Sequence, residues 1–116
     1  MTGVQTCALP IYALKPVVSG DLRKLTGTVP FVAEAALNLV YVADFAKLGN
    51  GDENNKNATA NANAGLIAEN VYLFCASEGL GAVVRGSVPR PELSKALNLR
   101  PDQRIVLAQT VGHIKK

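Results

Sequence analysis

Hydrophobic residues are most concentrated over residues 63–86, whose sequence is NAGLIAENVYLFCASEGLGAVVRG. From Ala64 to Ala76, apolar side chains fall on nearly every face of a helix with about 3.6 residues per turn, which predicts a helix surrounded by other elements. Asn63 is a suitable N-cap, and Gly79 suits the left-handed turn that ends many helices. Because the segment is too short and too polar to span a bilayer, we expect a core helix.

The residues that follow this helix, Ala82 to Gly86, predict a short strand that ends at a glycine. Gly86 lets the backbone approach a ligand closely because it has no side chain. Gly79, Gly81 and Gly86 do not form a dinucleotide-binding motif, since that motif follows a strand and opens a helix, whereas these glycines follow a helix. The pattern therefore places a candidate ligand site at the exit of the strand.

The rest of the hydrophobic pattern predicts short strands and helices that alternate along the chain. The first half of the chain predicts a strand over residues 12–19, which Pro16 confines to a sheet edge, then helical turns over 21–25 and 30–36 and a strand over 37–43. A loop is predicted over residues 49–63. After the core helix and its strand, the pattern predicts a helix that starts near Pro91 and a strand over 104–111 that stops at Gly112. The nearly continuous apolar run over 37–43 favours burial on both faces. The loop is expected because its segment is rich in asparagine, glycine and alanine and has no apolar period. This order of elements favours an α+β or α/β domain.

The composition is that of one globular domain, with 116 residues of which 48% are hydrophobic and 18% are charged. The net charge of +3 is unevenly distributed. Residues 1–78 carry five basic and seven acidic side chains, whereas residues 79–116 carry seven basic and two acidic ones. A positive C-terminal part can attract nucleic acid, membrane phosphate or a phosphorylated cofactor. Nucleic acid has little support, because no aromatic residues are interleaved with the basic ones.

The first eleven residues, MTGVQTCALPI, do not resemble a targeting signal, because they carry no charge and no basic region. They closely resemble the translation of a common short-read sequencing adapter, so we expect residues 1–11 to be an assembly artefact. On this hypothesis Cys7 is not native, the native sequence is truncated at Tyr12, and residues 12–116 are the C-terminal portion of a single longer domain. The one remaining cysteine offers no disulfide and no metal-ligand spacing, which favours a reducing, cytoplasmic location.

Several reactive residues have a simpler structural interpretation than a catalytic one. Cys75 lies among apolar residues in the middle of the predicted helix, where a thiol behaves as a small hydrophobic side chain. His113 is the only histidine, and no acid or nucleophile is visibly paired with it. Glu69 and Glu78 face different directions on the helix and do not form a carboxylate pair. The pattern therefore identifies no catalytic residue and no metal site.

Two long segments resemble the C-terminal half of the nitroreductase-like flavin oxidoreductases: AGLIAENVYLFCASEGLGAVVRG and PELSKALNLRPDQRIVLAQTVGHIKK. The family pattern is a helix of the form AGxxxQNxxLxAxxxGLG, an extended segment, a short helix, Leu-x-Pro-Asp and a closing VGxP followed by basic residues. The resemblance covers nearly everything from Leu37 onward, and LKPVVSGDLRKLTG and FVAEAALNLVYVAD are similar to the family's middle region. Glu69 replaces the usual glutamine, and His113-Ile114 replaces a common aromatic-proline pair.

This resemblance implies an FMN-dependent enzyme that takes hydride from NAD(P)H and passes electrons to an organic acceptor such as a nitroaromatic compound or a quinone. It also implies a partial nitroreductase-like α+β fold, with a mixed sheet and a buried central helix, in an intertwined bacterial homodimer with flavin at the subunit interface. It implies no nucleic-acid or membrane partner. The family's N-terminal Arg/Ser-rich motif, which supplies other FMN ligands, has no counterpart here, so we expect the chain alone to be inactive.

The resemblance also assigns cofactor contacts by position. Val84, Arg85 and Gly86 match the segment that runs along the isoalloxazine ring of FMN, where a backbone N–H near the reactive nitrogen favours the reduced state. Lys115 and Lys116 match the basic tail that neutralises the FMN phosphate. No catalytic residue and no metal ligand is implied within the chain, because the flavin carries the chemistry.

Two other hypotheses stay open at the level of sequence. The first is a small basic module that binds nucleic acid or anionic surfaces through the C-terminal basic residues, namely Arg85, Arg90, Lys95, Arg100, Arg104, Lys115 and Lys116. The second is a structural fragment with no activity of its own.

Overall fold

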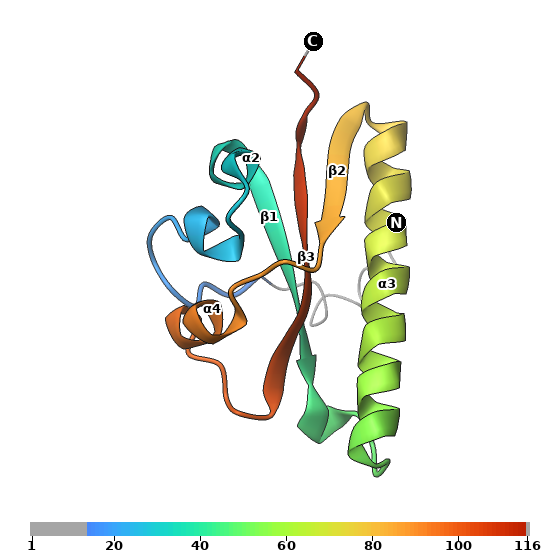
Figure 1. Ribbon diagram of the computed structural model, residues 1–116. Coiled ribbons are helices and arrows are strands. Elements are labelled where there is room, and N and C mark those ends of the chain that lie inside the picture. The colour runs from blue at the N-terminus through green and yellow to red at the C-terminus, as the bar shows by residue number, and fades with distance from the viewer. Residues whose placement is uncertain (1–13, 116) are drawn as a thin grey trace.

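Three antiparallel strands form a sheet that is covered on one face by a long helix and on the other by short helical elements (Figure 1). The computed structural model describes residues 14–115. The strands are β1 (Leu37–Asp44), β2 (Leu80–Arg85) and β3 (Gln103–His113), in the spatial order β1-β3-β2. The α+β class predicted from the sequence is confirmed.

β3 is the central strand and pairs with a neighbour on each side. It makes eight residue pairs with β1 and six with β2, and the last of the β2 pairs joins His113 to Leu80. Because Gly112 pairs with Gly81, the strand continues past the glycine at which it was predicted to stop. Both pairings are antiparallel, so the prediction of a mixed sheet is wrong for the described residues.

β1 lies at an edge of this sheet, which leaves it less covered than its apolar sequence suggests. Leu37 and Val42 are 48% and 38% exposed, so the predicted burial on both faces is wrong at these positions. The strand predicted over residues 12–19 is also wrong in its described part, since residues 14–19 form no strand. Pro16 lacks the N–H that a ladder requires, which accounts for the missing pairing there.

The long helix α3 (Glu53–Ser77) begins well before the predicted start at residue 63. Its N-cap is Asp52, whose carboxylate accepts a hydrogen bond from the Asn55 backbone N–H at 2.8 Å. The loop predicted over residues 49–63 is therefore wrong from residue 53 onward. Alanine has the highest helix propensity, Ala60 is buried, and most asparagines of the segment are on the exposed side of the helix. At the other end Gly79 has a positive φ of 68°, as predicted for a left-handed stop.

Only one face of α3 packs on the sheet. The side chains on that face are 2–5% exposed and belong to Ala60, Ala64, Ala68 and Cys75. Four large apolar side chains elsewhere on the helix are 51–67% exposed: Leu66, Ile67, Leu73 and Phe74. The predicted burial of Cys75 is confirmed, whereas the prediction that the helix is surrounded on all sides is wrong for this chain. Within residues 14–115, no helix has the length and apolar character needed to cross a membrane.

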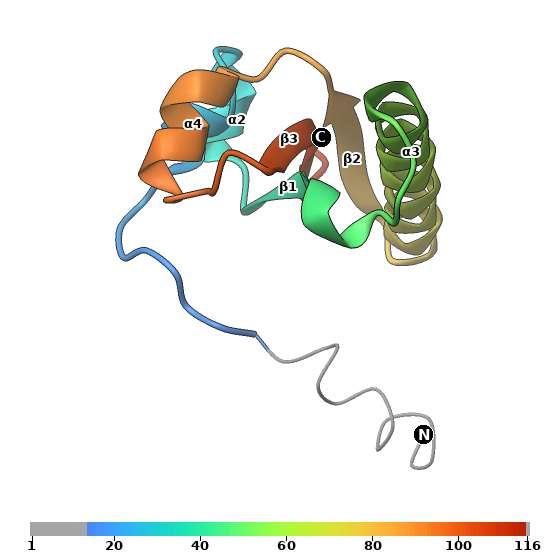
Figure 2. The same ribbon diagram turned by 90° about the horizontal axis from the view of Figure 1, so that it is seen from below.

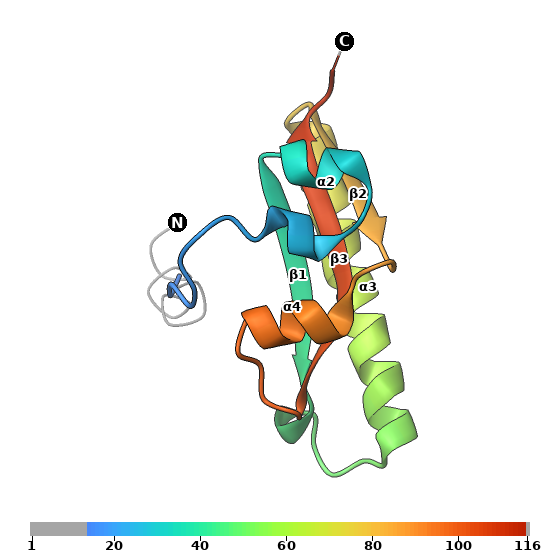
Figure 3. The same cartoon turned by 60° about the vertical axis from the view of Figure 1, so that its left-hand side comes forward.

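Short helical elements cover the opposite face of the sheet, as Figure 2 shows from below. They are η1 (Arg23–Thr26), α2 (Pro30–Glu34) and α4 (Arg90–Ala96), and Figure 3 shows η1, in blue, between α2 and α4 along that face. A further turn, η2 (Phe45–Lys47), comes directly after β1. The predicted helical turns and the helix near Pro91 are thus present. A core cluster lies beneath α4, where Leu93 is 1% exposed and packs with Val88, Ile105 and Ala108.

Gly27, directly after η1, leaves no room for a side chain. A Cβ at this position would overlap Nη1 of Arg85. The φ of 172° is extended and open to any residue, so the constraint is steric. We predict that Gly27→Ala lowers the free energy of unfolding by about 1–3 kcal/mol, the usual cost of overpacking, as measured by urea unfolding followed by circular dichroism.

The matched control is Gly65→Ala in α3, where an added Cβ meets no atom. Helix propensity is expected to raise the stability of this variant by about 0.5–1 kcal/mol. If Gly27→Ala were as stable as the unaltered chain, the packing of Arg85 against Gly27 would be contradicted.

Candidate functional site

A hollow of about 620 Å³ lies where α2 meets the paired strands β2 and β3. Its volume is within the range of about 300–1,000 Å³ that is typical of small-molecule sites. The strands contribute mainly small residues, namely Gly81, Ala82, Val83, Thr110 and Gly112, and the other wall consists of Phe31, Glu34, Ala35 and Ala36. Because most of these side chains are small, a ligand in the hollow can contact the strand backbone directly.

The mouth of the hollow carries one ion pair. Lys115 Nζ lies 3.1 Å from Glu34 Oε2, and the Lys115 side chain is 90% exposed. Exposed pairs of this kind contribute little to stability, so the lysine can leave Glu34 for another anion at small cost. His113 is also exposed and lines the same hollow.

The exit of β2 contains the three residues that the sequence assigned to the flavin ring. The Val84 backbone N–H donates to the Tyr72 hydroxyl at 2.6 Å, so in this structure it is not free for a ligand. Gly86 is exposed, and no atom lies within 4 Å of the position that a Cβ would take. The open surface at this end of β2 is therefore next to Gly86.

Arg85 is buried, with 7% of its surface exposed. Its Nε donates to Thr110 Oγ1 at 2.9 Å, and its terminal nitrogens donate to the carbonyl and hydroxyl of Thr26 and to Asn38 Oδ1. Burial lowers the pKa of the guanidinium. Because the side chain is fully engaged inside the protein, any contact of Arg85 with a cofactor at the β2 exit has to be made by its backbone.

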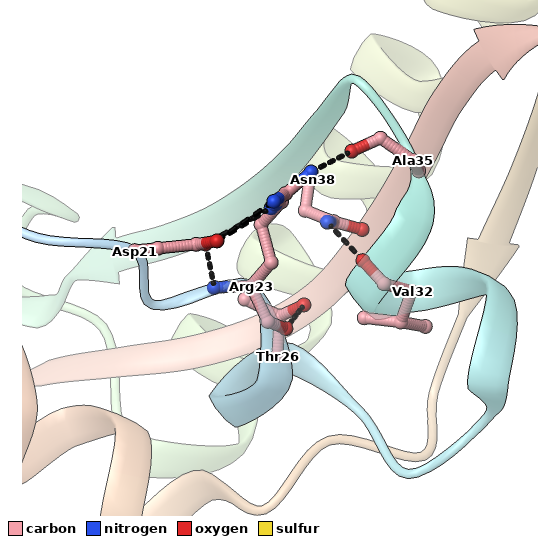
Figure 4. A network of polar contacts seen from close by, with 6 residues as sticks. All are labelled: Asp21, Arg23, Thr26, Val32, Ala35 and Asn38. Atoms are coloured by element: carbon pink, nitrogen blue, oxygen red, sulfur yellow. Dashed lines mark hydrogen bonds and ion pairs between the residues drawn. The ribbon is translucent and has the colours of Figure 1, made fainter.

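A polar network holds η1 against α2 and β1 (Figure 4). The Asp21 carboxylate accepts hydrogen bonds from Arg23, whose Nη1 also donates to the Ala35 carbonyl at 2.9 Å. Asn38 Nδ2 of β1 donates to the Val32 carbonyl at 2.9 Å. The side-chain and backbone hydrogen bonds from Arg23 lower the pKa of Asp21 to about 2. The α2 wall of the hollow is thereby fixed to the sheet.

The predicted cofactor residues lie near opposite ends of the β2–β3 pair. Arg85 is opposite Ala108, whereas Leu80 is opposite His113, two residues before Lys115. Five residue steps along a strand correspond to about 17 Å. The hollow includes Lys115 and reaches as far as Val83, so it is lined by one of the predicted cofactor residues but not by Val84, Arg85 or Gly86. Lys116 lies outside the described residues.

Sequence reasoning missed the polar residues that join α3 to the sheet. Gln109 is fully buried, accepts a hydrogen bond from the Tyr41 hydroxyl and donates to the Ala68 carbonyl at 3.1 Å. The available signal was the pair Gln109-Thr110 directly after the apolar run of residues 105–108, because buried polar side chains need partners. Tyr72, which covers the edge of β2, had no comparable signal in the sequence.

Comparison with known proteins identifies the family. The Nitroreductase family profile matches residues 7–113, nearly the whole chain. A crystal structure of a candidate nitroreductase from Ralstonia eutropha JMP134 is 39% identical, with a TM-score of 0.80, over 88% of this chain and 49% of that protein. The chain therefore belongs to the nitroreductase family, and the resemblance inferred from its motifs is confirmed.

A second solved structure, a nitroreductase family protein from Streptococcus pneumoniae TIGR4, supports the fold. Its TM-score is 0.69 at 19% identity, and the match covers 82% of this chain and 64% of that protein. The chain thus spans about half the length of one relative and less than two thirds of the other. No match is found among functionally curated proteins. The family match begins within residues 1–11, whose proposed adapter origin stays a prediction.

Tyr72 provides a test of the β2 edge. We predict that Tyr72→Phe leaves the Val84 N–H without its partner, speeds the exchange of the Val84 amide with solvent and lowers stability by about 1–3 kcal/mol. Hydrogen exchange followed by NMR measures the first effect and urea unfolding the second. Tyr41→Phe is the matched control, because it loses a hydrogen bond to Gln109 but leaves Val84 covered. Unchanged protection of Val84 in Tyr72→Phe would show that this hydrogen bond is absent.

Proposed function

We propose that this chain is part or all of an FMN-dependent oxidoreductase that transfers electrons from NAD(P)H to an organic acceptor, such as a nitroaromatic compound or a quinone. The observation that carries the proposal is the hollow along β2 and β3, in a chain that belongs to the nitroreductase family. When bound, FMN supplies the redox chemistry, and the protein binds and orients it.

The residues around the hollow fit a flat, anionic ligand. Gly81, Ala82 and Gly112 leave the strand backbone accessible, and Phe31 offers an aromatic side chain that is 42% exposed. Lys115 supplies a positive charge at the mouth for the phosphate, in exchange for its contact with Glu34.

The backbone donor proposed for the ring has to come from beyond Val84. Because the Val84 N–H is engaged by Tyr72, we assign the donor role to the Gly86 N–H, next to which the surface is open. Gly86 has no side chain that would keep a ring from approaching this backbone. Val84 then supports the flavin site by holding β2 in place, and Arg85 contacts the flavin only through its backbone.

Gly86 is suitable for a test, because it is exposed and a Cβ added there meets no atom beyond its chain neighbours. We predict that Gly86→Leu leaves thermal unfolding unchanged but raises the dissociation constant for FMN about tenfold, since steric obstruction costs about 1–3 kcal/mol. Quenching of flavin fluorescence measures the affinity, both for this chain and for the longest native form of the protein.

Gly65→Ala, on α3, serves as the control and should bind FMN as the unaltered protein does. Unaltered affinity in Gly86→Leu would remove Gly86 from the site. If neither form of the unaltered protein bound FMN, the proposed function itself would fail.

The alternative of a basic nucleic-acid module is weakened by the contacts of its basic residues. Arg90 donates to the carbonyls of Ile105 and Val106, and Arg100 pairs with Asp44 and Asp102. Arg104 pairs with Glu53 and lies 4.2 Å from the centre of the Phe45 ring. Arg85 is buried. Binding to a phosphate backbone needs several free cations, so these contacts weigh against it.

We further propose that the protein forms a homodimer through the outward side of α3. Four apolar side chains on one helix expose more than half of their surface, and burial of the exposed part of each is worth about 1–2 kcal/mol: Leu66, Ile67, Leu73 and Phe74. A second copy of the chain presents the same helix, so an isologous contact between two α3 helices covers both strips at once. The homodimer expected from the family resemblance supports this choice of partner.

This proposal predicts a change of mass in solution. Sedimentation velocity should give the mass of a dimer for the unaltered protein and that of a monomer for the double variant Leu66→Glu/Phe74→Glu, because two copies would bring buried carboxylates together. Leu14→Glu is the matched control, since Leu14 is 99% exposed outside the helix and its variant should stay dimeric. A monomeric unaltered protein at every concentration would contradict the proposal.

A further inference from the structure

Arg85 carries a buried charge that no acidic side chain of the described residues balances. All its hydrogen-bond acceptors are neutral oxygens, on Thr110, Thr26 and Asn38. The ion pairs found within residues 14–115 involve other residues. An arginine side chain stays protonated in proteins, so burial does not remove this charge.

The guanidinium is linked to the lining of the hollow through Thr110. Thr110 lines the hollow and accepts a hydrogen bond from Arg85 Nε at 2.9 Å, so a single side chain separates the charge from a ligand there. At the mouth, the charges of Lys115 and Glu34 offset each other. Because Arg85 is buried, its charge is weakly screened by salt and can act on a ligand across the Thr110 side chain.

The position of this charge is fixed by packing. The absence of a side chain at Gly27 leaves the space that Nη1 occupies, and the donors of the guanidinium are shared among η1, β1 and β3. A cation held in this way cannot turn toward solvent when a ligand enters. It therefore acts as a preorganised charge.

We propose that Arg85 is a positioning residue that makes the hollow favour the more negatively charged state of its ligand. This inference rests on the proposed function, in which the ligand is FMN. A hydride from NAD(P)H is one proton with two electrons, so a flavin that accepts it gains one negative charge while NAD(P)H becomes NAD(P)⁺. The fixed charge of Arg85 then binds reduced FMN more tightly than oxidised FMN, which raises the midpoint potential of the bound flavin.

The test compares the affinities of both flavin states in variants of Arg85. Dissociation constants for oxidised FMN and for dithionite-reduced FMN are measured without oxygen, for the unaltered protein, Arg85→Met and Arg85→Lys. In Arg85→Met, the affinity for reduced FMN should fall about tenfold more than that for oxidised FMN, which corresponds to a midpoint potential lower by about 30 mV for a two-electron couple. Lys115→Gln is the control and should weaken both states equally, because the phosphate is unchanged by reduction.

The outcomes separate this inference from the function on which it rests. Equal losses for the two states in Arg85→Met would overturn the inference and leave Arg85 a purely structural residue. If Arg85→Met does not fold, the inference is tested with Arg85→Lys, because this variant keeps the positive charge but makes fewer hydrogen bonds. It should be less stable yet keep the ratio of the two affinities within about twofold, and a tenfold change in that ratio would overturn the inference. Failure of the unaltered protein to bind either state would instead refute the proposed function.

Discussion

The hydrogen bonds of the buried Arg85 hold together parts of the chain that are far apart in sequence. From β2, its guanidinium reaches Thr110 on β3, Asn38 on β1 and Thr26 at the end of η1. The same group requires that position 27 be a glycine. Arg23 of η1 in turn donates to the Ala35 carbonyl directly after α2. The position of the α2 wall of the hollow therefore depends on the Arg85 side chain. A neutral residue could pack in the same volume. It would neither donate hydrogen bonds to acceptors on the three segments nor place a positive charge next to the hollow.

The opposite layer is held by a different kind of contact. α3 approaches the sheet closely because its inward positions are alanines, and Gln109 and Tyr72 provide the polar connections between helix and strands. The large apolar residues of the helix are on its outward side, where this chain alone does not cover them. The two layers thus have separate roles in the account proposed here, with the short helices forming a ligand site and the long helix forming a subunit contact.

Local signals in the sequence predicted the elements well, and they predicted the site only in part. The stop at Gly79, the strand exit at Gly86 and the helix near Pro91 depend on a few neighbouring residues, so they could be recognised directly. The start of α3 was missed because the asparagines suggested a loop. In the structure, the Asp52 cap and the alanines stabilise a helix over this segment. The role of Arg85 could not be predicted, since its partners Thr26 and Thr110 are 59 and 25 residues away along the chain. The family motifs could not show that the Arg85 side chain turns inward, and the flavin contact that they assign to this strand stays a prediction.

The central claim is that FMN occupies the hollow between α2 and the β2–β3 pair. The most direct measurement is a titration of the isotopically labelled protein with FMN, followed by the backbone amide resonances in NMR spectra. We expect the largest shifts along the hollow and at Gly86 beyond it; the residues along the hollow are Gly81, Ala82, Thr110 and Lys115. Shifts confined to β1 and the first half of α3, or no shifts at saturating FMN, would contradict it.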